Sequence, residues 1–160
     1  YSLLLFGMTG CNKADKVRRA VDASPRVAGQ VEVLLDNIIA ASDAGKLPVD
    51  PARQIVRIIK EKVNPLQKAY ADAVAAFPKT TPPTMPAPEL YADARAKFKA
   101  LSAAITEALV IFKILTPGQR ATIQFAIDTV IDTIDIIRNG FAVGDDYFKA
   151  KEELKWPTAV

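Results

Sequence analysis

Residues 123–141 read IQFAIDTVIDTIDIIRNGF and carry the clearest helical pattern in the chain. Its large apolar residues recur at alternating steps of four and three, which is the spacing of one face of an α-helix. Aspartates fall on the other side of the same segment. Such a helix needs other helices to cover its apolar face. The apolar positions are Ile123, Ile127, Val130, Ile134, Ile137 and Phe141.

Two earlier segments show the same period. In the first, Ser24 is expected as the N-cap and Pro25 as the first helical residue, where its missing N–H costs nothing. We expect this helix to stop at Gly45. The second is expected to begin with Asp50 as its N-cap. Its internal Pro65 predicts a kink, or two shorter helices in line.

A third segment runs from Pro88 to Leu115 with the same helical spacing. The next residues have the form of a capping box, with Thr116 as the N-cap and Gln119 three residues further on. We therefore expect the helix that contains residues 123–141 to start here, after a very short turn. A connection of this length predicts that the two helices are antiparallel neighbours.

Residues 78–88 hold five of the eleven prolines, which predicts a semi-rigid linker between two helical hairpins. The last long helix is expected to end at Gly140 or at Gly144, because glycine is the usual residue just past a helix. Asp145 is then expected to cap a short final helix that reaches Lys155.

The sequence thus predicts an all-α fold. We expect residues 24–160 to form a single domain, an antiparallel four-helix bundle with a proline-rich crossover and a short C-terminal helix. A chain of 160 residues with 50% hydrophobic residues is sufficient to bury one core. Four apolar stripes can enclose that core without metal or disulfide.

The composition argues against several kinds of chemistry. The chain has no His and one Cys, so an internal disulfide is impossible and metal sites lose their usual nitrogen and sulfur ligands. A net charge of +3 without a long basic stripe disfavours nucleic acid as a partner. Without His, a nucleophilic Ser or Thr would need Lys or a carboxylate as its base, and a Gly-rich phosphate loop is missing from the sequence. We therefore expect no enzyme and no cofactor.

Asp128, Asp132 and Asp135 share one side of the last long helix, and a hard cation could in principle bridge them. Helical geometry also places them opposite the apolar face, where carboxylates mainly keep a surface soluble. We favour the second interpretation and predict no metal site.

The first eleven residues, YSLLLFGMTGC, are an apolar run followed by small residues and the only Cys. Met8-Thr9-Gly10-Cys11 resembles the lipobox of bacterial lipoproteins, whose Cys receives a diacylglyceryl group. The first position of that motif is most often Leu, and here it is Met8. The resemblance implies that residues 1–10 are the end of a truncated signal peptide. It also implies that lipid on Cys11 anchors the protein to a membrane of the bacterial cell envelope, facing the periplasm or the exterior.

The alternative for Cys11 is a free thiol in an apolar N-terminal strand or helix. Residues 11–23 are polar and net basic, and they are expected to form a tether or a short helix in front of the domain.

A chain without recognisable catalytic residues is expected to have a binding role. The leading hypothesis is a membrane-anchored, non-enzymatic module that interacts with a protein partner or has a structural role. The alternative is a carrier that holds a lipid or another hydrophobic small molecule in the core of the bundle. Sequence spacing does not separate a filled core from a cavity.

Val110, Ile111 and Ile136 lie beside the expected apolar stripes and predict a partner surface. A sizeable exposed apolar patch is uncommon on a soluble monomer, so something should cover it. The candidates are a protein partner and the C-terminal segment, and we favour the C-terminal segment. Its aromatic residues are Tyr147, Phe148 and Trp156.

Overall fold

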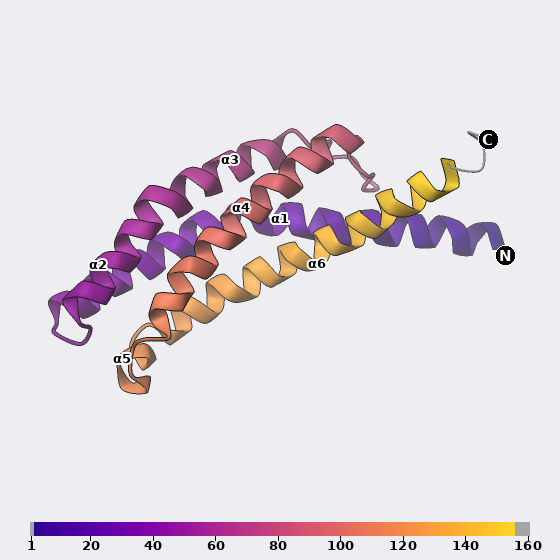
Figure 1. The fold of residues 1–160 in the computed structure, drawn as a ribbon. Coiled ribbons are helices and arrows are strands. Elements are labelled where there is room, and N and C mark those ends of the chain that lie inside the picture. Colours follow the sequence, from indigo (N-terminus) through magenta and orange to yellow (C-terminus); the bar gives the residue numbers. More distant parts are fainter. Residues whose placement is uncertain (1, 156–160) are drawn as a thin grey trace.

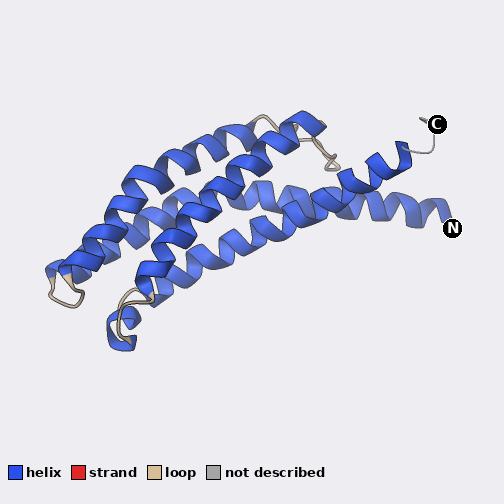
Figure 2. Cartoon of the chain, viewed as in Figure 1, coloured by secondary structure: helices blue, strands red, loops and turns tan. Residues whose placement is uncertain are grey.

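The structure, a computed structural model, describes the backbone of residues 2–155 and the side chains of residues 13–152. Every regular element in this part of the chain is a helix, as Figure 2 shows, so the prediction of an all-α fold is confirmed. The elements are α1 (Ser2–Asp43), α2 (Val49–Ile58), a π-helical turn η1 (Ile59–Val63), α3 (Asn64–Ala75), α4 (Pro88–Phe112), α5 (Pro117–Ala121) and α6 (Gln124–Lys155).

The helix start predicted at Ser24 is wrong, because α1 continues through Pro25. The Ser24 hydroxyl donates to the carbonyl oxygen of Ala20 at 2.7 Å, within the same helix. The segment expected as a tether or short helix supplies buried residues such as Val17 and Ala20. Burial of these side chains favours the helix on the N-terminal side of Pro25 and outweighs the one backbone hydrogen bond that proline cannot donate.

The turn between α1 and α2 is formed as predicted, with Gly45 in the left-handed region at a φ of 73°. The N-cap predicted at Asp50 is wrong, because α2 already begins at Val49. Asp50 lies in the first turn instead, where its charge is favourable beside the N-terminal end of the helix dipole. The effect predicted for Pro65 is confirmed: α2 and α3 are two helices in line, joined by η1, and Pro65 lies in the first turn of α3.

The capping box at Thr116 is present. The backbone N–H of Gln119 donates to Thr116 Oγ1 at 3.3 Å, and the backbone N–H of Thr116 donates to Gln119 Oε1 at 3.0 Å. It begins only the short α5, and the long helix starts after a further break, at Gln124. The proline-rich segment forms the connection between α3 and α4, as predicted.

The helix ends predicted at Gly140 and Gly144 are wrong, and so is the separate C-terminal helix, because α6 is continuous to Lys155. Both glycines lie where α6 meets another helix. A Cβ at Gly140 would lie 2.4 Å from the Cβ of Ala20, and a Cβ at Gly144 would lie 2.4 Å from the ring of Tyr91. These glycines therefore allow close helix packing and do not end the helix.

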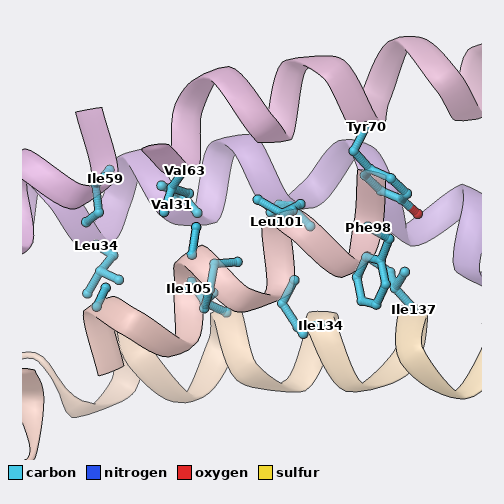
Figure 3. Close-up of a cluster of buried hydrophobic side chains, with 14 of the residues drawn as sticks. Val31, Leu34, Ile59, Val63, Tyr70, Phe98, Leu101, Ile105, Ile134 and Ile137 are labelled. Carbon is cyan, nitrogen blue, oxygen red and sulfur yellow. The ribbon is translucent and has the colours of Figure 1, made fainter. Parts of the chain in front are cut away.

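The helices pack against one another around one core. α1 lies along α6, and α3 lies along α4, while α2 and η1 also contact α4 (Figure 1). Figure 3 shows side chains of α1, η1, α4 and α6 pointing toward one another, among them Val31, Val63, Ile105 and Ile134. The backbones of α4 and α6 approach each other at few points, in contrast to α1 and α6. This difference leaves one side of the molecule open.

Candidate functional site

A groove of about 530 Å³ lies between α4 and α6, on the side where their backbones diverge. Its floor is aromatic, because the rings of Phe98 and Phe141 stack there with their centroids 5.4 Å apart. Tyr70 of α3 supports both rings from the core, at centroid distances of 5.5 and 6.2 Å. The floor is thus held by packing and cannot easily collapse into the groove.

The groove continues along α4 and α6 toward α5. This second part has a volume of about 210 Å³ and shares Ser102, Thr106 and Arg138 with the first. Its remaining surface is mainly aliphatic. The aliphatic lining residues are Ile105, Leu109, Ile131 and Ile134.

One end of the groove is closed by a polar cluster. Arg95 Nε donates to both carboxylate oxygens of Asp145, at 2.6 and 2.7 Å. The Tyr91 hydroxyl lies 2.7 Å from Asp145 Oδ1 and 2.6 Å from the carbonyl oxygen of Phe141, so one proton serves two acceptors. This cluster joins α4 to α6 at the end where the helices would otherwise separate.

The electrostatics of this cluster favour the charged carboxylate. Burial raises the pKa of Asp145, but the hydrogen bonds from Arg95 and Tyr91 outweigh it, and the net pKa lies below its usual value. Burial and the neighbouring Asp145 raise the pKa of Tyr91, so its hydroxyl keeps its proton. The cluster is therefore a fixed ion pair with a neutral donor, and it is not poised to transfer protons near neutral pH.

The rim of the groove carries cations and hydroxyls. Arg138 donates from Nη2 to Ser102 Oγ at 3.0 Å and from Nη1 to Asp135 Oδ1 at 2.8 Å. Lys99 is exposed and forms none of the ion pairs found among the described residues. An aromatic and aliphatic floor with a weakly basic rim suits an amphipathic occupant that carries some negative charge.

The three residues predicted as one partner surface are exposed in part but lie on different faces. Val110 is 54% exposed and lines, with Ile111, a groove of about 450 Å³ between α2 and α4. Ile136 is 42% exposed and lines another groove, of about 710 Å³, between α1 and α6. The sequence therefore identified exposed apolar side chains, and the structure does not bring them together.

In the part of the C-terminal segment that the structure describes, the aromatic residues do not cover this surface as predicted. Phe148 packs against Tyr91, with ring centroids 4.7 Å apart, near the opposite end of α4 from Val110 and Ile111. Tyr147 lies under the Lys151 ammonium, 5.5 Å from its ring centroid. The third aromatic residue of the prediction, Trp156, lies outside the described residues. Because α6 is one continuous helix, its end cannot fold back over the other face.

Two of the three α6 aspartates considered as metal ligands have partners within the protein, and the third, Asp132, is exposed. Asp128 accepts a hydrogen bond from Gln124 Nε2 at 2.8 Å, and Asp135 accepts one from Arg138. Over the part of the chain that the structure describes, no three potential metal ligands gather in one place. The same part contains no helix with the length and apolarity to cross a membrane. The side chain of Cys11 lies outside the described residues.

The core offers little room for a ligand. The space enclosed among the side chains of Val31, Val63, Ile105 and Val130 amounts to about 20 Å³. A cavity of this size holds about one water molecule. A lipid chain does not fit there, so a hydrophobic ligand would have to occupy one of the surface grooves.

The residues that shape the α4–α6 groove were missed in the sequence, although a signal for them exists. Arg95, Lys99, Ser102 and Thr106 follow one another at steps of four, three and four, beside the apolar stripe of the helix. This spacing places them on one line along α4. Comparisons with models of protein families, with curated proteins and with solved structures found no match to this chain.

Proposed function

We propose that the chain is a lipid-anchored, non-enzymatic module of the bacterial cell envelope that binds a helical segment of a protein partner in the α4–α6 groove. In this proposal α1, the α2–α3 arm, α4 and α6 act as one antiparallel four-helix bundle with the α4–α6 side left open. The observation that carries it is the groove itself, with the stacked rings of Phe98 and Phe141 as its floor.

The shape of the groove favours a helix as its occupant. Two helices whose axes diverge leave a long trough with aliphatic walls, and a third helix can place an apolar stripe into such a trough. The trough extends over both parts of the groove, from Arg95 to Leu109 along α4. Arg95 and Arg138 are paired with Asp145 and Asp135, so Lys99 supplies the rim charge that favours a partner helix with acidic residues beside its apolar stripe.

A bulky side chain in the middle of the groove tests this function. Thr106 is exposed and lines both parts of the groove, so Thr106→Trp should fill it without disturbing the core. Ala100 is exposed on α4 outside the groove, about 120° from Thr106 around the helix, and Ala100→Trp is the matched control. Native mass spectrometry of protein purified from its host should show a stoichiometric protein partner with the parent and the control, and none with Thr106→Trp.

A second candidate function is a carrier of a hydrophobic small molecule. The observation in its favour is the volume of the groove, about 530 Å³, which lies in the range of small-molecule sites. The same measurement separates the two functions. A co-purifying mass of lipid size that Thr106→Trp removes would support the carrier, and a bound polypeptide supports the interaction module.

Acylation of Cys11 is the part of the proposal that sets the location. The support for it is the resemblance of Met8-Thr9-Gly10-Cys11 to a lipobox. The two or three acyl chains of a mature lipoprotein would hold the protein firmly, whereas one chain binds only weakly. Mass spectrometry of protein extracted from host membranes should find a chain that begins at acylated Cys11. An intact N-terminal segment with a free Cys11 thiol would contradict acylation.

A further inference from the structure

The face formed by α1 and α6 carries a basic stripe that the proposed function does not use. Lys16, Arg19 and Arg26 are exposed and line the groove of about 710 Å³ between these helices. Their spacing of three and seven residues places them in one row along α1. Opposite them, α6 contributes Ile136 and Val143. We call these five residues the α1–α6 face.

The positive charge of this face is not neutralised within the protein. Asp22 contributes a carboxylate to the lining of the groove, and this carboxylate is paired with Arg18 at 3.3 Å. The ion pairs found among the described residues involve none of Lys16, Arg19 and Arg26. The row of three cations on α1 therefore offers positive charge to an anionic surface, and the exposed Ile136 of α6 adds a small apolar contact.

Gly140 lets α6 lie directly against α1 along this face. A Cβ at this position would lie 2.9 Å from the backbone oxygen of Lys16. The close approach of the two helices holds the cations of α1 and the apolar side chains of α6 side by side on one surface.

We propose that the α1–α6 face binds the headgroups of anionic phospholipids and lays both helices flat on a bilayer surface. Lys16 and Arg26 are ten residues apart, which corresponds to about 15 Å along a helix. The field of an anionic membrane decays over about 8 Å at physiological ionic strength. All three cations can lie in that field only if α1 runs parallel to the membrane. Ile136 then faces the boundary between headgroups and acyl chains.

This inference depends neither on acylation of Cys11 nor on the α4–α6 groove, and its test is arranged accordingly. The full-length chain with Cys11→Ser is sedimented with vesicles of phosphatidylcholine alone and with vesicles of equimolar phosphatidylcholine and phosphatidylglycerol. The apolar N-terminal residues contribute to both. We expect binding to the anionic vesicles to be at least ~10-fold stronger, because several basic residues each add to the attraction, and to weaken as salt is raised.

Two charge variants with equal net charge locate the effect. In Lys16→Gln/Arg19→Gln/Arg26→Gln the preference for anionic vesicles should disappear. In the control, Arg53→Gln/Lys60→Gln/Lys68→Gln, three exposed cations of α2, η1 and α3 are removed and the preference should remain. Equal loss in both variants would overturn the proposal, because net charge alone would then explain binding. Unchanged binding of the first variant would overturn it as well.

A labelling measurement tests the orientation without removing any cation. Asn139 is exposed and lines the groove of the α1–α6 face. Ala100 of α4 is also exposed and lies outside this groove. A nitroxide attached at Asn139→Cys in the Cys11→Ser chain should become protected from a water-soluble relaxation agent when anionic vesicles are added. The same label at Ala100→Cys should stay accessible. Protection at neither position, or at both alike, would contradict a flat orientation on this face.

Discussion

Ser24 and Tyr70 are fully buried and join α1 to α3 through one hydrogen bond of 2.6 Å between their hydroxyls. Because the Ser24 hydroxyl donates to the carbonyl oxygen of Ala20, the Tyr70 hydroxyl is the donor in the bond that they share. Burial raises the pKa of Tyr70 far above its usual value, and the hydrogen bond to Ser24 only partly offsets this, so Tyr70 keeps its proton. Ser24 thus joins two helices, where the sequence predicted a helix cap.

Removing the Ser24 hydroxyl and removing the Tyr70 hydroxyl should lower the free energy of unfolding by different amounts. Ser24→Ala leaves the buried Tyr70 hydroxyl without its acceptor and should cost about 2 kcal/mol of unfolding free energy. Tyr70→Phe removes the donor and leaves Ser24 bonded to Ala20, and should cost about 1 kcal/mol. In the double variant the cost should be smaller than the sum, because no buried donor is left over. Urea unfolding measures all three, and strictly additive costs would argue against the bond.

Asp145 should make stability depend on pH. Its pKa in the folded protein lies below the usual value of about 4, so its contribution is present above that value and is lost as pH falls through the lowered pKa. Its side chain is 35% exposed, which limits the contribution to about 1 kcal/mol or less. Asp145→Asn should remove this part of the acid sensitivity, and Asp128→Asn, which alters a carboxylate bonded to a neutral amide, should not. Urea unfolding at pH 7 and pH 3 compares them, and equal effects would contradict the assignment.

At the scale of elements, one glycine of α6 and one of α1, Gly140 and Gly29, should respond in opposite ways to replacement by alanine. Gly140→Ala places a methyl group against Ala20 and the backbone of Lys16. Overpacking of about 1–3 kcal/mol should exceed the gain in helix propensity of about 1 kcal/mol. Gly29 is an exposed helical residue, and a Cβ added there would have no neighbouring atom within 4 Å, so Gly29→Ala should stabilise by about 0.5–1 kcal/mol. Thermal unfolding decides, and a stabilised Gly140→Ala would refute the close packing of α1 and α6.

The sequence predicted the helical segments but not all of their ends. The apolar period and the capping box at Thr116 predicted helical segments, because both signals are local. The local sequence around Pro25 and around Gly140 is compatible with a helix that ends there and equally with a helix that continues. What decides between the two is contact with a distant residue, such as that of Gly140 with Ala20. A single sequence does not contain that contact, and the predicted boundaries at these positions were wrong for this reason.

At the scale of the whole molecule, the two proposed surfaces lie on different sides of α6. Arg138 and Phe141 face the α4–α6 groove, while Asn139 and Val143 face the α1–α6 groove. If the α1–α6 face rests on a bilayer, the α4–α6 groove is directed away from it and stays accessible to a partner. Opposite sides of α6 would thus contact the membrane and bind the partner.

The candidate site could be predicted from the sequence only in part. The exposure of Val110 and Ile136 followed from their positions outside the apolar stripes, and the structure agrees. The groove could not be predicted, because it exists only where α4 and α6 diverge, and the divergence depends on packing of every helix at once. Acylation of Cys11 stays a prediction, since its side chain lies outside the described residues.

Site-specific photo-crosslinking in the host tests most directly whether a partner occupies the α4–α6 groove. A photoreactive phenylalanine analogue is placed at Ala142 of α6, which is exposed in the groove, or at Ala100 of α4, which is exposed outside it. We expect one discrete crosslinked protein from position 142, none from position 100, and loss of the product when Thr106→Trp fills the groove. Equal products from both positions, or a product from position 142 that Thr106→Trp leaves unchanged, would contradict partner binding in the groove.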